Sequence, residues 1–330
     1  MTILVTGGAG YIGSHCVQHL MSHGHSVVVF DDLSTGYERF VLSPHFVKGN
    51  TRDKALLVKT IQDFHVTAVM HFAASCYVGE SVNEPGKYYG NNVYGTLQLL
   101  DAMRETKVSQ LVFSSTCATY GVPQTLPLTE EHPLNPISPY GKTKRIVEMM
   151  MEDYSLAYGL NYVALRYFNA AGADSTGKLG EAHEPETHLI PLVLQTATGK
   201  RKNIQIFGTD YDTPDGTCIR DYIHIVDIAE AHRLALTYLT AGNSSDVFNL
   251  GTGHGFSVRE IIQACEQITG KPIAVVEAPR RPGDPAKLVA NAAKANKVLG
   301  WKPAFGELTE IIRTAWQWEQ QVTELPSLSR

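Results

Sequence analysis

The sequence predicts an α/β protein in which a doubly wound parallel sheet is followed by a smaller C-terminal α/β domain. Over residues 1–169, short apolar runs of strand length alternate with stretches of helical periodicity, which is typical of βαβ units that share one parallel sheet. After Gly172, loops rich in Gly, Pro, Asp and Thr surround shorter elements, which indicates a second unit. We therefore assign residues 1–169 to a first domain and 170–330 to a second, and segments such as 247–255 are candidates to return to the first.

The expected strands of the first domain are continuous apolar runs, as is typical of strands buried on both faces of a sheet. They cover residues 3–5, 27–30, 68–70, 111–113 and 162–165. Two stretches of helical length lie between them, over 88–106 and 139–158. The second has a proline near its start, which a helix tolerates there, and the first has apolar residues at helical spacing: Val93, Leu97, Leu100 and Met103.

Composition limits the class of protein. The chain has 330 residues, of which 43% are hydrophobic, which suits about two domains with a sizeable core and excludes a disordered chain. Charged residues make up 18%, and the formal net charge is -5. Because there is no basic excess to neutralise a phosphate backbone or an anionic bilayer, we expect neither nucleic acid nor a membrane as a partner.

The cysteines and the N-terminal segment indicate a reducing compartment. The 5 cysteines are widely spaced and include no CxxC pair, so we expect neither a disulfide framework nor a metal site. No apolar run approaches the ~20 residues that span a bilayer. The first Lys or Arg is Arg39, so the start lacks the basic region of a signal peptide. We therefore expect Met1 to lie close to the mature N-terminus and the protein to be cytoplasmic.

A glycine-rich segment directly follows the first expected strand. Gly7, Gly10 and Gly13 are evenly spaced, and an apolar helix pattern follows. In a dinucleotide loop such glycines permit a tight turn, close approach of a pyrophosphate and packing of helix on sheet, while the helix N-terminus faces the phosphates. The second strand ends in Asp31 and Asp32, whose carboxylates suit an adenosine ribose and would repel a 2′-phosphate. The pattern therefore predicts NAD rather than NADP.

A second glycine cluster, residues 251–255, follows the apolar run 247–250. Its spacing differs from that of a phosphate loop, and no acid follows at the required distance. We therefore expect a glycine turn and then a helix capped by Ser257.

A tyrosine, a lysine and a group of hydroxyls suit acid–base chemistry. Tyr140 and Lys144 have i, i+4 spacing at the start of the second expected helix, so both lie on one face. A phenol with a pKa of about 10 is a poor base at neutral pH, but an ammonium and a positively charged nicotinamide favour the phenolate. Upstream, the strand over 111–113 leads into hydroxyls that include Thr116, at the sheet edge where such folds bind ligands. Tyr-x3-Lys alone also fits a half-buried tyrosine beside a solvated lysine.

These motifs together resemble the extended short-chain dehydrogenase/reductase family, and within it the sugar-nucleotide epimerases. The resemblance runs nearly from end to end. It implies a Rossmann sheet with NAD in the first domain and a UDP-sugar in the second. The segments that carry it, besides those above, are 71–74, 78–81, 88–92, 166–169, 215–217, 220–224 and 281–284.

By this resemblance Tyr140 is the acid/base, and Lys144 holds the nicotinamide ribose and tunes the tyrosine. The catalytic hydroxyl is Thr116, where the epimerases commonly have Ser, and either hydroxyl can bridge the sugar 4-OH and Tyr140. Asn50 and Thr51 replace a common Asp-Ile pair at the adenine, and a common Lys is replaced by cysteine at 76. The implied cofactor contacts are Gly7, Gly10, Tyr11, Ile12, Gly13, Asp31, Asp32, Thr35, Gly36, Asn50, Thr51, Phe72, Ala73, Ala74, Cys76, Asn91, Thr116, Tyr140, Lys144 and Phe168.

The second domain carries charges that suit a sugar nucleotide, because arginine forks bind pyrophosphate well. The resemblance implies that Arg220 and Arg281 grip the diphosphate and that Asp284 accepts from a ribose hydroxyl. Such charges also form surface ion pairs, which is the alternative. Leu288 faces the sugar in this family, so we expect an N-acetyl group to be accepted at a reduced rate unless this side chain simply packs in its loop. The implied substrate contacts are Thr116, Tyr140, Asn169, Leu189, Phe207, Arg220, Arg281, Asp284 and Leu288.

The residues after Thr116 limit which reaction the site can catalyse. Dehydratases of this fold carry an Asp-Glu pair there, whereas this chain has Cys117 and Ala118, so elimination of water is disfavoured. We expect interconversion of UDP-glucose and UDP-galactose, in which Tyr140 takes the 4-OH proton, hydride passes between C4 and NAD, and a 4-keto sugar turns before hydride returns. One alternative is a 4-epimerase acting mainly on UDP-N-acetylglucosamine or another UDP-sugar. A catalytically silent NAD-binding module is another, although it would usually lack the Tyr or the Lys.

The two long helices carry more apolar side chains than one sheet-facing stripe needs, among them Met149, Met150, Met151 and Leu156. The family pairs these helices between subunits, so the resemblance implies a homodimer. The alternative is that these side chains only cover the sheet. The expected setting is galactose and carbohydrate metabolism.

Overall fold

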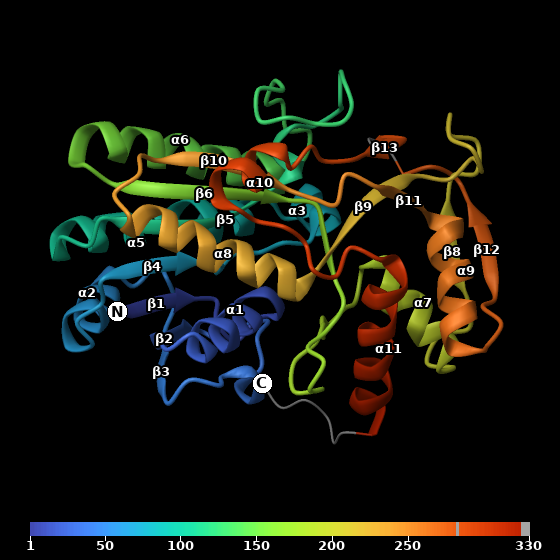
Figure 1. Ribbon diagram of the computed structural model, residues 1–330, viewed down its shortest axis with the longest axis horizontal. Helices are drawn as coiled ribbons and strands as arrows, with labels where there is room; N and C mark the ends of the chain where they lie inside the picture. The colour runs from blue at the N-terminus through green and yellow to red at the C-terminus, as the bar shows by residue number, and fades with distance from the viewer. Residues whose placement is uncertain (282–283, 325–330) are drawn as a thin grey trace.

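The computed structural model describes residues 1–281 and 284–324, and its centre is a seven-stranded sheet with helices on both faces (Figure 1). The strand order is β10-β6-β5-β4-β1-β2-β3, and all neighbours are parallel. The predicted doubly wound sheet is confirmed. The half-exposed edge strand β3 was not expected, because it lacks a continuous apolar run. The strands are β1 (Thr2–Thr6), β2 (Ser26–Asp31), β3 (His45–Lys48), β4 (Ala68–His71), β5 (Gln110–Thr116), β6 (Asn161–Tyr167) and β10 (Asp246–Leu250).

Alternating side chains of the central strands point into two separate cores. Ile3 and Val5 pack with α1 (Tyr11–Ser22) and α8 (Ile225–Thr240) on one face. Leu4 packs on the opposite face with the other long helices, α2 (Lys54–Asp63), α5 (Gly95–Thr106) and α6 (Pro139–Tyr158). The continuous apolar runs of these strands follow from this burial on both faces. Short 3₁₀ turns occupy Glu38–Phe40 and Cys117–Thr119.

The helix predicted over 88–106 is interrupted. A π-helical turn at Tyr89–Tyr94 separates α5 from the preceding short helices, α3 (Val78–Asn83) and α4 (Pro85–Tyr88). The turn contains the buried Asn92, whose amide donates to Ser75 and Thr143. Apolar periodicity does not reveal such a turn, because the helical spacing continues on both sides of it. The helix predicted over 139–158 is confirmed as α6.

The second half of the chain builds a smaller lobe, on the right of Figure 1. Its core lies among α7, α9, α11 and β8, and a four-stranded sheet centred on β9 lies beside it. None of the helices within the described residues combines the length and the hydropathy needed to cross a bilayer. Its elements are β7 (Asn169–Ala171), α7 (Leu189–Ala197), β8 (Ile204–Phe207), β9 (Ile219–His224), β11 (Gly255–Ser257), α9 (Val258–Thr269), β12 (Val275–Ala278), β13 (Lys287–Leu288) and α11 (Leu308–Glu324). Helix α10 (Ala293–Leu299) instead packs against the larger lobe beside β10 and α8.

The chain passes between the two lobes more than once. β10 lies in the large sheet, where Val247 pairs with β6, and a few residues later Gly255 pairs with β9 of the smaller lobe. Ser257 then caps α9: its Oγ accepts from the Glu260 amide, and the Glu260 carboxylate accepts from the Ser257 amide. The predicted capped helix is confirmed.

Candidate active site

The glycine loop between β1 and α1 has the shape of a phosphate cradle. A Cβ on Gly7 would lie 2.5 Å from the Ala73 nitrogen, and one on Gly13 would lie 2.1 Å from the Gly7 oxygen, so the protein's own packing requires both glycines. A Cβ on Gly10 would meet nothing closer than 3.4 Å. Gly10 is the N-cap of α1, and no side chain caps the helix there. The fold does not require this glycine, but a pyrophosphate at the helix N-terminus would.

Asp31 and Asp32, at the end of β2, have different partners. The buried Asp31 carboxylate accepts from the amides of Ala9 (3.0 Å) and Leu33 (2.8 Å), so it holds the glycine loop against the strand end. Burial raises the pKa of Asp31, and these amide bonds oppose the shift. Asp32 is half-buried and accepts from the Asn50 amide at 2.6 Å. Asp31 therefore shapes the loop in addition to its predicted position at the ribose.

The other predicted cofactor contacts follow the ends of the parallel strands. A Cβ on Gly36, after β2, would approach the Ala9 backbone to 2.9 Å. The Phe72 and Ala73 amides, after β4, donate to the Thr6 carbonyl at 2.9 and 3.1 Å. The remaining ones lie at the start of α1, after β2, β3, β4 and β6, and in the π-helical turn: Tyr11, Ile12, Thr35, Asn50, Thr51, Ala74, Asn91 and Phe168.

Tyr140, Lys144 and Thr116 come together where α6 begins beside the end of β5. Gly141 packs so closely on the Ala118 carbonyl that a Cβ would come within 2.5 Å. Thr116 at the end of β5 lies close enough to the Tyr140 hydroxyl to influence its pKa. The predicted catalytic residues are therefore neighbours in the structure.

Burial dominates the protonation of the tyrosine and the lysine. Lys144 is 3% exposed and donates to the Ser114 carbonyl at 2.7 Å. Burial lowers the pKa of Lys144 to about 8, against the effect of nearby acidic groups. Burial also raises the pKa of Tyr140 well above its ordinary value, and the neighbouring Thr116 hydroxyl opposes this. The predicted lowering of the tyrosine pKa therefore depends on positive charge brought by a bound nicotinamide.

The loop after β4 and the π-helical turn approach the same residues. The exposed Cys76 lies close enough to influence the charges of Tyr140 and Lys144. Asn91 donates to the Ser75 hydroxyl at 3.2 Å, which joins the turn to this loop. Cys76 and Asn91, which were predicted to contact the cofactor, therefore lie in the same region as Tyr140 and Lys144.

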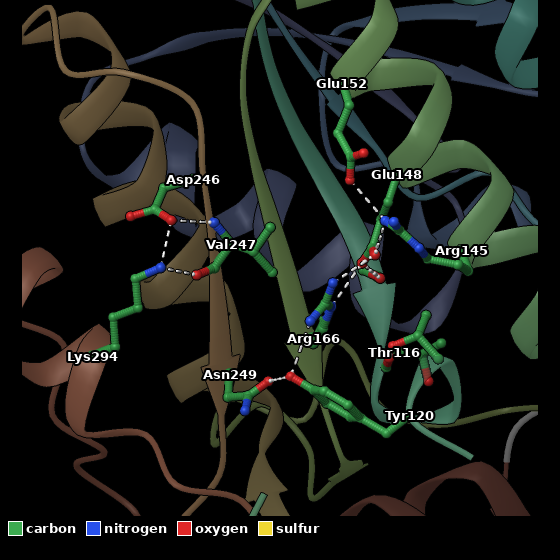
Figure 2. A network of polar contacts seen from close by, with 12 residues as sticks. Thr116, Tyr120, Arg145, Glu148, Glu152, Arg166, Asp246, Val247, Asn249 and Lys294 are labelled. Carbon is green, nitrogen blue, oxygen red and sulfur yellow. Dashed lines mark hydrogen bonds and ion pairs between the residues drawn. The ribbon is translucent and has the colours of Figure 1, made fainter. Parts of the chain in front are cut away.

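A buried polar network connects α6 with β5, β6 and β10 (Figure 2). The Glu148 carboxylate accepts from the Arg166 guanidinium at 2.9 and 2.7 Å and from the Ser115 hydroxyl at 2.7 Å. Arg166 also donates to the Tyr120 hydroxyl at 3.1 Å, and Tyr120 donates to Asn249 at 2.7 Å. Glu148 and Arg166 are 1% and 3% exposed. The network therefore fixes α6 relative to the strands beneath it.

None of these network residues was predicted as part of the site. Glu148 lies one helical turn after Lys144, and Ser115 directly precedes Thr116, so the network positions the residues that meet at the end of β5. Arg166 opens the 166–169 segment that the family resemblance includes. The one signal for this network in the sequence is a charged residue at a position expected to be buried, because a buried charge needs a partner. Arg166 on a core strand and Glu148 on α6 are such residues.

The predicted substrate residues lie on strands and loops of the smaller lobe. Arg220 on β9 pairs with Asp284 at 2.8 Å, and their side chains are 13% and 33% exposed. The Arg281 guanidinium lies 3.9 Å from the centre of the Phe207 ring. Burial raises the pKa of Cys117 to about 12, and Arg220 is the first charge that opposes this, so Arg220 approaches the turn after Thr116. Residues 282 and 283 of the 281–284 motif lie outside the described residues.

The apolar substrate-side residues also pack inside the protein. Leu288 on β13 pairs with Arg220 and packs, half-buried, against the core of the larger lobe. Leu189 begins α7 and packs against the core of the smaller lobe. Asn169 begins β7 and pairs with Tyr222 of β9. Leu288 therefore has the packing role of the alternative interpretation and also lies beside Arg220.

The chain belongs to the NAD dependent epimerase/dehydratase family, whose model matches residues 3–251, which confirms the predicted family. It is similar to the UDP-glucose 4-epimerase of Halalkalibacterium halodurans, with 51% identity over 321 residues, 97% of this chain and 96% of the relative. A crystal structure of UDP-glucose 4-epimerase from Brucella ovis in complex with NAD is 52% identical, with a TM-score of 0.94 and coverage of 96% and 97% of the two chains. The Bifidobacterium longum UDP-glucose 4-epimerase in complex with NAD⁺ and UDP is 40% identical, with a TM-score of 0.92 and coverage of 97% and 98%.

Proposed function

We propose that this protein interconverts UDP-glucose and UDP-galactose by reversible oxidation at C4 of the sugar. The observation that carries the proposal is the meeting of Tyr140, Thr116 and the buried Lys144 at the end of a sheet whose glycine loop leaves the α1 N-terminus without a side-chain cap. Relatives with 51% and 52% identity are named UDP-glucose 4-epimerase. These names favour the two hexoses over UDP-N-acetylglucosamine or another UDP-sugar as the main substrate.

The residues present fit NAD. Gly10 leaves space at the α1 N-terminus, and the half-buried Asp32 offers a carboxylate to a ribose while disfavouring the 2′-phosphate of NADP. Lys144 is the proposed partner of the second ribose. When bound, NAD supplies the oxidant that accepts a hydride from C4 and gives it back. The other predicted cofactor contacts are proposed to line the same site.

Acid–base chemistry is proposed for Tyr140. Its hydroxyl oxygen takes the proton of the sugar 4-hydroxyl and later returns it, and the neighbouring Thr116 hydroxyl bridges the two oxygens. The Lys144 ammonium, held by the Ser114 carbonyl, supplies positive charge beside them.

The two lobes are proposed to divide the binding of cofactor and substrate. The larger lobe, formed by residues 1–169 with α8, β10 and α10, holds NAD, and the rest of 170–330 binds the UDP-sugar. Arg220 and Arg281 are the proposed diphosphate ligands, because paired guanidinium groups suit that anion. Asp284 is the proposed acceptor for a ribose hydroxyl. The proposed lining of the nucleotide and sugar is Asn169, Leu189, Phe207 and Leu288.

The turn after Thr116 favours epimerisation over elimination of water. Burial raises the pKa of Cys117 to about 12, so this thiol is an even weaker acid than an ordinary cysteine. Ala118 carries no acidic group. The turn therefore offers no acid that could protonate a departing hydroxyl.

The test is incubation of the purified protein with UDP-glucose, UDP-galactose and their N-acetyl forms without added NAD. We expect each hexose to be converted into the other and near-stoichiometric NAD(H) to be released when the protein is denatured, because a restored oxidant need not leave. A strict requirement for added NAD with net NADH production would instead indicate a dehydrogenase.

We also propose a homodimer formed through α5, α6 and the π-helical turn. Tyr94, Met149 and Leu156 are 50%, 49% and 89% exposed, whereas Met151 is buried in the core. Exposed apolar side chains on neighbouring helices suit an interface between copies. Light scattering at micromolar concentration should give the dimer mass, and a monomer mass would refute the dimer.

A further inference from the structure

Four potential metal ligands converge in the loop between β7 and α7. One ligand atom each of Glu181, His183, Glu186 and His188 lies within 4.8 Å of all the others. His183 Nδ1 is 3.2 Å from Glu181 Oε1 and 3.6 Å from Glu186 Oε1, and His188 Nδ1 is 3.9 Å from Glu186 Oε1. His188 Nδ1 and Glu181 Oε1 also form a short hydrogen bond. A tetrahedral ion with ligands at about 2.0–2.1 Å separates them by about 3.3 Å. The separations of 3.2, 3.6 and 3.9 Å suit one central ion, whereas His188 Nδ1 and Glu181 Oε1 must move apart to bind it.

No Lys or Arg balances the charge of this cluster. The Glu181 and Glu186 side chains are 5% and 6% exposed, and within residues 1–281 and 284–324 their only ion-pair partners are His183 and His188. Buried carboxylates need compensating positive charge. Two protonated imidazoles or one divalent cation could provide it.

His183 distinguishes these two possibilities. Its Nδ1 is buried and has no hydrogen-bond partner, although two carboxylate oxygens lie within 3.6 Å. A protonated imidazole that served as a counterion would direct its N–H at one of those oxygens. Ligand atoms of a metal ion instead face a common centre, and His183 Nδ1 has this relation to Glu181 and Glu186: it lies close to both carboxylate oxygens but is not aligned with either for a hydrogen bond.

We propose that Glu181, His183, Glu186 and His188 bind one divalent transition-metal ion, with Zn²⁺ the best match. Imidazole nitrogens and carboxylate oxygens are both zinc ligands, and four protein ligands are typical of a structural zinc site. The two carboxylates neutralise the ion. His188 is 46% exposed, which gives the ion access from solvent. The expectation of no metal site rested on the cysteines, and residues 181–188 contain none.

The ion would hold the 172–188 loop in place beside the cofactor side of the protein. The Trp318 indole donates to the Glu181 carbonyl at 2.7 Å, which anchors one end of the cluster. The His183 ring meets the Tyr11 ring edge-on, with centroids 6.3 Å apart, and Tyr11 is the first residue of α1. Because α7 begins directly after the cluster, the metal would tie the start of α7 to the helix of the glycine loop.

The test is zinc binding by the full chain, purified without a histidine tag and freed of metal. The protein is titrated with ZnCl₂, desalted and analysed by plasma mass spectrometry, and its melting is followed with and without EDTA. We expect about one zinc per chain and a higher Tm with zinc. The double variant Glu181→Gln/His183→Gln should lower the affinity for zinc by more than about tenfold. Loss of a group that only orients a metal ligand already lowers the affinity about 10–100-fold.

His23→Gln is the matched control. His19, His23 and Glu230 form a second group of potential ligands, but the Arg233 guanidinium already pairs with Glu230 at 2.6 Å. Zinc content of the His23→Gln variant should equal that of the wild type.

Equal zinc content in the wild type and the Glu181→Gln/His183→Gln variant, or none in either, would overturn the proposal and assign the compensating charge to protonated imidazoles. Should the variant fail to fold by circular dichroism, Co²⁺ added to the wild type decides. Intense visible bands of tetrahedral cobalt support the site, and a weak octahedral spectrum overturns it. These results do not depend on sugar conversion.

Discussion

The cofactor side and the substrate side of the proposed site are built differently. On the cofactor side, Asp31 and Lys144 are 8% and 3% exposed, and backbone groups of strand ends and loops hold both side chains. On the substrate side, Arg220 and Asp284 are more exposed and pair with each other. The acid–base geometry is therefore fixed by the protein itself, whereas the charged groups for the nucleotide hold one another.

This difference separates two kinds of mutational effect. Changes on the cofactor side should alter the rate or the stability of the protein, because those groups are buried and fully bonded. Changes on the substrate side should alter KM, because their charges are more accessible and make few bonds to the rest of the protein.

Tyr140→Phe should have the largest effect. Removing the phenolic oxygen removes the proton acceptor, so kcat for UDP-galactose should fall by about 10²–10⁴-fold while UDP binding changes little. Steady-state kinetics and calorimetry with UDP measure both. Tyr94→Phe, at a 50% exposed tyrosine, is the control and should retain activity. A near-native kcat for Tyr140→Phe would remove this residue from the mechanism.

Glu148→Gln should lower the free energy of unfolding by about 3–5 kcal/mol, because it leaves the buried Arg166 without its counterion. Urea unfolding followed by circular dichroism measures the change. Glu152→Gln is the control, since this carboxylate is 46% exposed and pairs with Arg145, and it should cost less than about 1 kcal/mol. Equal effects of the two substitutions would show that burial does not distinguish the pairs.

Lys144 should make the protein more stable as the pH rises. Its pKa is about 8 in the folded protein and 10.5 ordinarily, so between these values the unfolded chain binds a proton that the folded chain lacks. Raising the pH from 8 to 10.5 therefore favours the folded state by an amount on the order of 2–3 kcal/mol. The stability difference between the wild type and Lys144→Met should show this rise. Lys142→Met, at an exposed position on the same helix, should run parallel to the wild type, and a flat difference for Lys144→Met would contradict the lowered pKa.

Arg281→Ala should raise KM for UDP-galactose by about 10–100-fold with a smaller change in kcat, because a hydrogen bond to a charged group contributes about 1.5–3 kcal/mol. Initial-rate kinetics separate the two constants. Arg280→Ala is the control, because Arg280 pairs with the exposed Asp210, and its KM should be unchanged. A fall in kcat without a rise in KM would show that Arg281 affects the rate of the reaction and not the binding of the substrate.

Leu288→Tyr should have the smallest effect, on specificity. A tyrosine ring takes the space that an N-acetyl group needs, so activity on UDP-N-acetylglucosamine should fall about tenfold relative to UDP-glucose, within the range for a steric change in a pocket. Product analysis with the two sugars gives the ratio. Since Leu288 also packs against the core, an equal loss on both sugars would show that it supports the fold instead.

The continuity of the central strands and the bounds of α6 could be predicted from the sequence. Ser138 and Pro139 begin α6, and Gly159 ends it at a φ of 74°, a conformation that favours glycine. The glycine loop could also be predicted from the sequence. Gly13 is required by a contact with Gly7 in the same loop, and Gly7 by a contact with Ala73, which follows the neighbouring strand β4. Such features depend on local conformation and on burial within one sheet.

The partners of the buried charges were decided only by the tertiary structure. Arg166 and Glu148 lie on different elements, and nothing in the sequence near either residue specifies the other. The same holds for Arg220 on β9 and Asp284 in the segment before β13. A charge pattern shows that a residue needs a partner, but packing of distant segments selects which one.

The sequence by itself determined the class of this protein. Short motifs predict the parallel sheet, the dinucleotide loop and the Tyr140–Lys144 pair with Thr116. Only the tertiary structure decided that Asp31 bonds the glycine loop, that α5 begins after a π-helical turn, and that Glu148 on α6 meets Arg166 on β6. The physical reason is that helix caps, turns and apolar runs depend on residues near one another in the chain. Side-chain convergence depends on how separate elements pack.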